Sequence, residues 1–512
     1  MPSVSAGASG LVPYGRRLRD LASERPGAPA ITFAFVDRTQ RTLTFGQLDV
    51  AAIRAAHLLS GHGVSSSTLV VVVLPNGPAH VIATHAAWKL GASVLPYNPR
   101  APRPEREQVL QVASTFRPVV TVGAWTDGIP PDVTALEVEA APAEAVATQL
   151  PDLTPVPGAV IASGGTTGTP KLTITEVPAA LRVRDGQPDL SQAQLGLRPG
   201  LVHLITTPLY HTSGFNWTHL EMLVGNHVVV AERFDGGLWL DLVERHRVSH
   251  AIVVPSIMQR LVSRSDIAER DLSSLEFLCH GGSVCPDWVK RRWLELVPPR
   301  GVIEAFGGTE PIGGTSIDGE EWLRHPGSVG RPTRCDLRIL DPDGRDLPPE
   351  QVGEIFMRPL GAISAPFRYA GAPYHATAPG GFVSVGDFGW VDAEGYLYIA
   401  DRRVDMIITG GANVYPAEVE SCLSEHPLVA DAAVIGLSDP RWGRRVHAVV
   451  LPRDPGLPPG AADLERHCRE RLAPYKVPKT YEVVSALPRS EAGKLARRAL
   501  VEAREPANPD DR

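Results

Sequence analysis

The chain has 512 residues, a formal net charge of −7 and 43% hydrophobic residues, so it is long enough to need at least two hydrophobic cores. Charges of both signs are interspersed, which excludes a basic surface for nucleic acid, and no apolar run approaches the roughly 18 residues that a membrane span needs. These properties predict a globular protein with neither a nucleic-acid partner nor a membrane span.

The N-terminus and the cysteines indicate a reducing compartment. Residues 1–10 lack the charged and apolar regions of a secretory signal. The five cysteines form neither a metal-ligand spacing nor an even set for disulfides. We therefore expect a cytoplasmic protein, monomeric or homodimeric, in which the cysteines are small core residues.

From about residue 66, apolar runs rich in β-branched residues alternate with amphipathic stretches. This alternation predicts strands at 68–74 and 92–95 and helices at 79–90 and 105–116. Nearly continuous runs of Val, Ile and Leu are typical of parallel strands covered on both faces. The same rhythm predicts further strands at 202–206, 228–230, 251–254, 277–280 and 302–306. We expect an α/β fold whose large N-terminal domain holds mostly parallel sheets covered by helices.

The pattern changes in the second half of the chain. Residues 123–157 are acidic and rich in Pro and Ala, which predicts an excursion over the surface. After Pro332, short runs with turn signals predict a small antiparallel β-rich subdomain that closes the large domain. A compact α+β unit follows, with predicted helices at 416–424 and 461–472 and a last helix from Lys494. We therefore expect a large domain at 1–401 and a small, mobile C-terminal domain at 402–512.

The most informative motif is a Gly- and Thr-rich loop that follows the apolar run 158–162. Three glycines offer unhindered N–H groups, four hydroxyls add donors, and a lysine adds a cation, so the loop suits a polyphosphate. It is not a Walker loop, because Pro170 precedes the lysine and Leu172 follows it. The candidate phosphate-binding residues are Ser163, Gly164, Gly165, Thr166, Thr167, Gly168, Thr169 and Lys171.

A second strand also runs into a Gly-rich turn, at 302–310, and this turn ends in Thr309 and Glu310. The threonine hydroxyl suits a phosphate contact. Magnesium takes only one or two protein carboxylates and completes its octahedron with phosphate oxygens and water, so one Glu beside a phosphate loop is sufficient. We expect Glu310 to hold Mg²⁺, the alternative being a carboxylate that only starts a helix.

Three further segments complete the set. A Gly-Gly turn follows the strand at 277–280 and supplies Gly281, Gly282 and Ser283. In the segment 385–397, Asp387 is a carboxylate suited to accept hydrogen bonds from both hydroxyls of a ribose. Near the C-terminus, the segment 487–498 contains a Gly-Lys pair that ends at Lys494.

In their order along the chain and in their residues, these segments resemble the motifs of the adenylate-forming superfamily of acyl-CoA synthetases, peptide adenylation domains and luciferases. The resemblance covers about residues 20 to 500 and implies that a carboxylic acid and MgATP give acyl-AMP and pyrophosphate. It implies that Lys494 is the catalytic lysine and that Thr309, Glu310 and His211 act beside the reacting groups. It assigns the adenine to the Gly281–Ser283 turn with Phe306 and Gly307, and the ribose to Asp387 and Arg402.

The resemblance is greatest to acyl-CoA ligases, which implies coenzyme A as the second substrate. His211 stands where peptide adenylation domains place an aspartate for the substrate ammonium, so an α-amino acid is disfavoured. An aromatic, fatty or polycyclic acid is expected instead, in a pocket lined by Phe215, Asn216, Trp217, Pro255, Gly308, Ile312 and Gly313.

Two positions depart from the family pattern. Val404 stands at the hinge position, which is usually aspartate or lysine, and Leu172 stands where glycine is usual. The first alternative function is therefore an amide bond synthetase, in which an amine captures the acyl-AMP. The second is a nucleotide-binding protein without catalytic activity.

Overall fold

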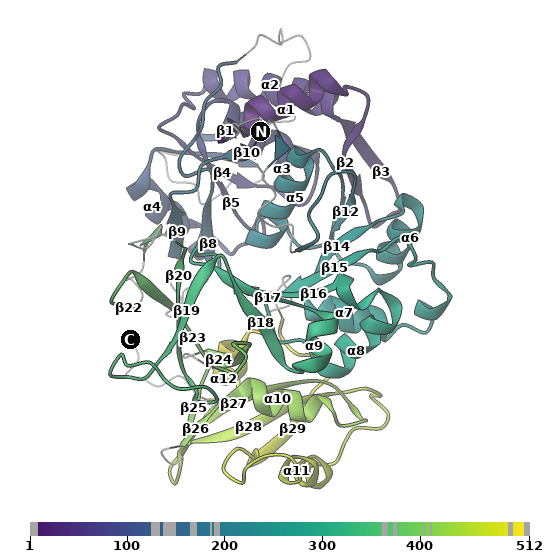
Figure 1. Ribbon diagram of the computed structural model, residues 1–512, viewed down its shortest axis with the longest axis vertical. Coiled ribbons are helices and arrows are strands. Elements are labelled where there is room, and N and C mark those ends of the chain that lie inside the picture. Colours follow the sequence, from purple (N-terminus) through teal and green to yellow (C-terminus); the bar gives the residue numbers. More distant parts are fainter. Residues whose placement is uncertain are drawn as a thin grey trace, which may run out of the picture.

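The computed structural model describes residues 9–123, 134–136, 150–163, 171–184, 187–188, 195–360, 367–371, 376–402, 405–409, 412–489 and 495–505 (Figure 1). Among these residues, no helix is both long and apolar enough to cross a bilayer. The architecture is mixed α/β, as expected, with a large sheet assembly above a small C-terminal sheet in Figure 1.

The first parallel sheet contains the strands that the β-branched runs predict. Its order is β5-β4-β6-β7, and all of its pairs are parallel. The first three strands are β4 (Leu69–Val73), β5 (Ser93–Pro96) and β6 (Val119–Gly123), followed by β7 (Thr134–Leu136). The helices of this region are α1 (Tyr14–Glu24), α2 (Phe45–Gly61), α3 (Pro78–Lys89) and α4 (Arg103–Phe116). Most of the predicted excursion at 123–157 lies outside the described residues.

The main sheet has a parallel half in the order β16-β15-β14-β12-β13-β2, with β3 antiparallel at its edge. Its strands are β2 (Pro29–Ala34), β3 (Gln40–Thr44), β12 (Val202–Ile205), β13 (His227–Ala231), β14 (His250–Val253), β15 (Phe277–Gly281) and β16 (Val302–Gly307). All five strands predicted between residues 202 and 306 are confirmed within a residue or two of their bounds.

Helices cover both faces of this parallel half, because successive strand residues point to opposite sides. Leu204, Val229 and Ala251 pack with α6 (Gly236–His246), α7 (Pro255–Val262) and α8 (Asp287–Leu296). The next residues along two of these strands, Ile205 and Ile252, pack with α1, α2 and α5 (Thr212–Val224). This two-sided burial explains why the strands read as continuous apolar runs.

The antiparallel β-rich region predicted after Pro332 is present, and its strands continue the main sheet. Strand β17 turns antiparallel to β16, and the sheet continues through β18, β24, β23, β20 and β19. The sheet continues here because the free edge of β16 presents unpaired N–H and C=O groups, and β17 forms hydrogen bonds with them. These strands are β17 (Gly314–Asp318), β18 (Ser328–Thr333), β19 (Cys335–Leu340), β20 (Gly353–Pro359), β23 (Phe382–Val391) and β24 (Leu397–Arg402), with β22 (Thr377–Ala378) beside β23 and α9 (Gly319–Arg324) after β17.

Two small antiparallel sheets, which the sequence did not predict, join distant segments. One contains β1 (Ser9–Pro13), β10 (Ala180–Arg184) and β11 (Gln187–Pro188). The other has the order β21-β9-β8 and contains β8 (Val160–Ser163), β9 (Lys171–Thr175) and β21 (Phe367–Ala370). The second sheet matters for function, because it holds both ends of the predicted phosphate loop.

The C-terminal sheet is covered on both faces. Its strands are β25 (Ile407–Thr409), β26 (Ala412–Val414), β27 (Val429–Asp439), β28 (Gly443–Pro452) and β29 (Thr480–Val483). Helices α10 (Pro416–Ser424) and α11 (Ala461–Arg469) pack on one face, and α12 (Arg497–Glu502) packs on the other. The helix predicted at 416–424 is confirmed with the same bounds. The helix predicted from Lys494 begins at Arg497, and Lys494 lies outside the described residues.

Candidate functional site

The carboxyl ends of β15 and β16 bring two predicted segments together. The strands pair in parallel, with Gly281 opposite Ala305, so the 281–283 turn and the 307–310 turn leave the same edge of the sheet. A Cβ atom on Gly281 would lie 2.3 Å from the Ala305 carbonyl oxygen. This close approach requires glycine and explains why the chain places one at the strand end.

The predicted phosphate and magnesium residues meet in space although they lie far apart in sequence. Ser163 and Lys171 are paired residues of the β8–β9 hairpin, so the loop 164–170 connects them. Lys171 Nζ lies 3.5 Å from Glu310 Oε1, and both side chains are largely buried. A cation and a carboxylate therefore stand side by side at the mouth of the predicted phosphate loop.

A third side chain, Tyr369 of β21, joins this pair and was not identified from the sequence. Its hydroxyl donates to Glu310 Oε1, and Lys171 Nζ lies 4.3 Å from the centre of its ring. Tyr369 reaches the site because β21 pairs antiparallel with β9. No local motif marks it, and only the long-range strand pairing reveals it.

Thr309 contacts the first turn of helix α5. Its Oγ1 lies 3.0 Å from Thr212 Oγ1, the residue after His211. His211 is half-buried and stands at the N-cap of α5, with its ring 4.6 Å from that of Tyr210. The predicted His211 and Thr309 thus lie at one end of the sheet, and Thr212 is the contact that sequence reasoning missed.

The two predicted ribose contacts are direct neighbours across a pair of strands. Asp387 of β23 is opposite Arg402 of β24. Asp387 is 5% exposed. The side chain of Arg402 lies outside the described part of the structure. The register makes the two backbones neighbours, and their contact with a ribose stays a prediction.

Several predicted positions lie outside the described residues and stay predictions. They are Gly164, Gly165, Thr166, Thr167, Gly168, Thr169, Val404 and Lys494, together with the side chain of Ser163. Leu172 is described, and it is fully buried in the core beneath the first parallel sheet. A glycine at this position would leave that core unfilled, which accounts for leucine.

The side chains assigned to the acid pocket divide into two groups. Phe215, Trp217 and Ile312 are buried apolar residues, at 2%, 9% and 2% exposure. Asn216, between the first two on α5, is exposed. Phe215 packs in the core of the first parallel sheet, Trp217 in the core between the main sheet and helices α1, α2 and α5, and Ile312 in the core of the β-rich region, so the assigned lining stays a prediction.

Burial also sets the charge of the groups next to the site. It lowers the pKa of His280 well below the usual value, and Lys290 adds to this effect, so the imidazole is neutral. Burial raises the pKa of the Cys279 thiol to about 12. All five cysteines are free and buried, as expected for core residues.

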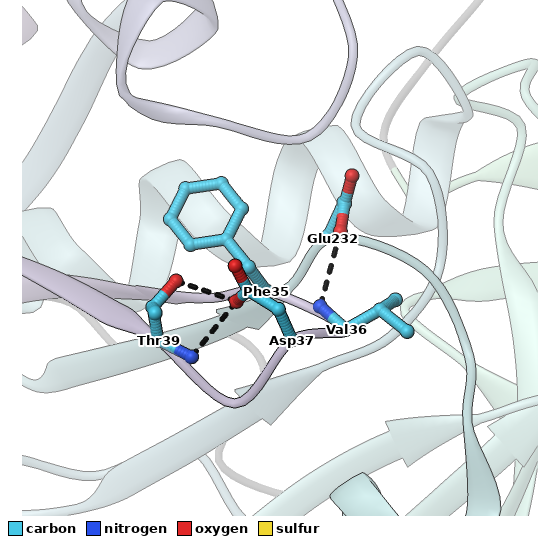
Figure 2. A pocket seen from close by; sticks show the side chains of 5 residues that line it. All are labelled: Phe35, Val36, Asp37, Thr39 and Glu232. Atoms are coloured by element: carbon cyan, nitrogen blue, oxygen red, sulfur yellow. Dashed lines mark hydrogen bonds between the residues drawn. The ribbon is translucent and has the colours of Figure 1, made fainter.

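A surface hollow at the other end of the same sheet edge does not belong to this site (Figure 2). It is separated from β16 by four strands, or roughly 20 Å. Asp37 Oδ1 accepts from Thr39 N and Oγ1 at 2.9 and 2.6 Å, and Val36 N donates to Glu232 at 3.1 Å. Its polar groups therefore satisfy one another.

Comparison with known families gives two matches. The family described as AMP-binding enzyme matches residues 18–363, and the family described as AMP-binding enzyme C-terminal domain matches residues 418–494. Together they span most of the chain.

Individual proteins give the same result. The indoleacetate–CoA ligase of Aromatoleum aromaticum is 32% identical over 501 residues, which are 93% of this chain and 94% of that protein. The o-succinylbenzoate CoA synthetase MenE of Bacillus subtilis, solved with ATP and a magnesium ion, has a TM-score of 0.78 at 27% identity, covering 96% and 100% of the two chains. The amide bond synthetase McbA of Marinactinospora thermotolerans has a TM-score of 0.75 at 23% identity, covering 96% and 99%, which shows a shared fold alone.

Proposed function

The chain belongs to the AMP-binding enzymes, and from this premise we propose that it joins a carboxylic acid to coenzyme A through an acyl-adenylate. The observation that carries the proposal is the meeting of Lys171 and Glu310 beside the hairpin of the predicted phosphate loop. In the first step a carboxylate oxygen bonds to the α-phosphorus of ATP and pyrophosphate leaves. In the second step the thiol of coenzyme A takes the acyl group and AMP leaves.

The residues of the site fit MgATP. Glu310 offers hard carboxylate oxygens at the end of β16, and its Oε2 would lie 2.7 Å from a Cβ at Gly308, so a side chain there would obstruct it. Glu310 would hold the magnesium ion, which would supply positive charge against the phosphates. Lys171 would contact the same phosphates, and Thr309 would donate to them through its hydroxyl. Asp387 and Arg402 would hold the ribose.

We propose an apolar acid as the substrate, aromatic in the first instance. The residues that the sequence assigns to the lining, among them Phe215, Trp217 and Ile312, are mostly apolar, and rings and aliphatic groups offer dispersion contacts to an apolar acyl group. The relative from Aromatoleum aromaticum is named for indoleacetate, which supports an arylacetic acid as the first member of a test panel.

Pyrophosphate release tests the proposal directly. The purified chain is given MgATP and a panel of arylacetic, cinnamic and fatty acids, with coenzyme A, with an amine or with neither. We expect acid-dependent release, and a thioester only when coenzyme A is present. An amide product without any thioester would instead establish an amide bond synthetase. Binding of ATP without acid-dependent release of pyrophosphate would establish a nucleotide-binding protein without catalytic activity.

The lysine at position 494 is the sharpest single test of the mechanism. Lys494→Ala should lower acid-dependent pyrophosphate release by roughly 100-fold or more, because a cation is removed from the developing negative charge. Arg469→Ala, at an exposed position of α11 in the same sheet unit, is the matched control and should leave the rate unchanged. Normal pyrophosphate release by Lys494→Ala would refute the assigned role.

A further inference from the structure

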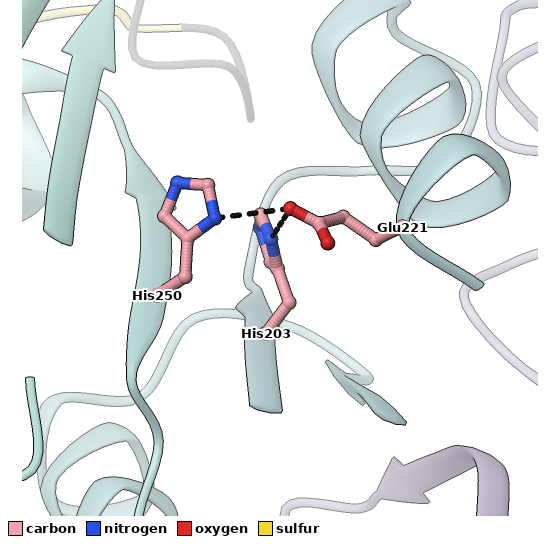
Figure 3. Close-up of side chains that lie close together, drawn as sticks. All are labelled: His203, Glu221 and His250. Atoms are coloured by element: carbon pink, nitrogen blue, oxygen red, sulfur yellow. Dashed lines mark hydrogen bonds and ion pairs between the residues drawn. The ribbon is translucent and has the colours of Figure 1, made fainter. Parts of the chain in front are cut away.

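Three titratable side chains form a cluster inside the main sheet region that the acid-activating chemistry does not use (Figure 3). His203 of β12 and His250 of β14 are opposite each other on paired parallel strands. Glu221 of α5 lies over both. All three side chains are fully buried, at 0% exposure.

The donor atoms of the cluster converge on one point. His203 Nδ1 lies 2.8 Å and His250 Nδ1 lies 3.0 Å from the same carboxylate oxygen, Glu221 Oε1. The three donor atoms all lie within 4.8 Å of one another. Two imidazole nitrogens and one carboxylate oxygen are a donor set that zinc prefers.

The carboxylate is held in place by a second layer of contacts. Asn226 Nδ2 donates to the other oxygen of Glu221. Asn226 is itself fixed, because its Oδ1 accepts from Leu201 N at 3.0 Å and its Nδ2 donates to Arg198 O at 2.8 Å. Outer partners that orient a ligand in this way are usual at metal sites.

The two histidine rings have no other polar partner within the described part of the chain. The Nε2 atoms of His203 and His250 are buried without a hydrogen bond. Trp217 packs against both rings, at 5.7 and 5.4 Å between centroids. Packing therefore fixes the rings, and their only polar contacts point to Glu221.

We propose that His203, Glu221 and His250 form a structural site for one divalent transition metal ion of the zinc class. Both rings would present Nδ1 to the ion and carry one proton on Nε2, so a neutral ring changes tautomer on loading and releases no proton, whereas a protonated ring loses its Nδ1 proton to water. The ion would cross-link β12, β14 and α5. Because the cluster is enclosed, the ion enters while the chain folds.

Metal content is the first test. The full-length protein is produced in zinc-supplemented medium, desalted and analysed by inductively coupled plasma mass spectrometry. We expect about one zinc per chain, and at least a tenfold loss in His203→Gln and in Glu221→Gln. His85→Gln is the matched control, because His85 is an equally buried histidine that lies 3.2 Å from His219 without a carboxylate; it should keep the zinc.

Cobalt gives a second readout that needs no variant. The wild-type chain is unfolded in chelator, refolded with Co²⁺ and then given excess MgATP. We expect visible d–d bands of nitrogen and oxygen ligation that MgATP does not abolish. If the wild-type chain holds no zinc and develops no cobalt absorption bands, the cluster is a hydrogen-bond network only, and the proposal is overturned. Zinc retained by both His203→Gln and Glu221→Gln would overturn it as well, because the ion would then lie elsewhere.

Discussion

Among single residues, Glu310 receives contacts from two distant strands. Lys171 reaches it from β9, and Tyr369 reaches it from β21. Neither contact is local in sequence. The carboxylate is therefore oriented before any ligand arrives, which lowers the cost of assembling a charged site.

Tyr369→Phe should weaken the site without unfolding the protein. The phenylalanine keeps the ring beside Lys171 but removes the donor to Glu310. A hydrogen bond to a charged group contributes about 1.5–3 kcal/mol, so we expect kcat/KM for MgATP to fall by roughly tenfold or more. Pyrophosphate release at varied MgATP measures it. Tyr396→Phe removes a comparable hydroxyl, bonded to Arg331 at 2.7 Å, and an equal loss there would contradict a role specific to the site.

At the scale of elements, a buried ion pair links helix α8 to strand β16. Lys290 Nζ lies 2.6 Å from Glu304 Oε2, with side-chain exposures of 0% and 8%. The ammonium also lies 4.8 Å from the ring of Trp322. This pair fixes the strand whose end carries the 307–310 turn.

Lys290→Met should destabilise the fold more than the loss of a surface ion pair would. The substitution leaves Glu304 buried without its cation, which costs roughly 3–5 kcal/mol. Urea unfolding measures the change. The double variant Lys290→Met with Glu304→Leu removes both charges and should recover most of the lost stability; a double variant no more stable than the single one would show that packing, and not charge, is the cause.

The predicted elements were most accurate where one sequence pattern determined them. The strands of the parallel half and helix α10 follow directly from apolar periodicity. The antiparallel strands after Pro332 were predicted from their turn signals, but their continuity with the main sheet through β17 and β18 was not, because those backbone hydrogen bonds carry no sequence signature. The sheets β1-β10-β11 and β21-β9-β8 were not predicted for the same reason.

For the whole molecule, buried histidines make stability depend on pH. Burial lowers the pKa of His80 and His85 from 6.5 to about 3. In the unfolded chain these rings bind protons as pH falls below about 6.5, but in the folded chain they do not until about pH 3. The unfolded state therefore binds more protons in this window, so stability falls as pH falls.

The expected change in the free energy of unfolding with pH is measurable. Each such histidine lowers the free energy of unfolding by roughly 1.4 kcal/mol per pH unit within the window. Thermal unfolding from pH 7.5 to pH 5 should show a falling Tm, and His85→Gln should make that decline shallower. His62→Gln, at an exposed position, should leave the decline unchanged. A Tm that is constant over this range would contradict the neutral, buried state of these rings.

The two-domain division at 401/402 stays a prediction. Strand β24 ends at Arg402 in the main sheet, and β25 begins at Ile407 in the C-terminal sheet. The two parts touch through Gln259, which donates to Ala430 O, and through Arg453, which lies 5.3 Å from the ring of Trp288. The first contact is a hydrogen bond and the second places a cation near an aromatic ring, and the mobility of the small domain stays a prediction.

The sequence by itself determined the α/β class, the order of the motifs and the candidate residues Glu310, Lys171 and Asp387, because glycine turns and apolar periodicity are local properties of the chain. Only the tertiary structure decided which residues meet. It brought Tyr369 to Glu310, Thr212 to Thr309 and Glu221 to the two histidines. These contacts depend on strand pairing and helix packing between segments far apart in sequence, and no local pattern encodes them.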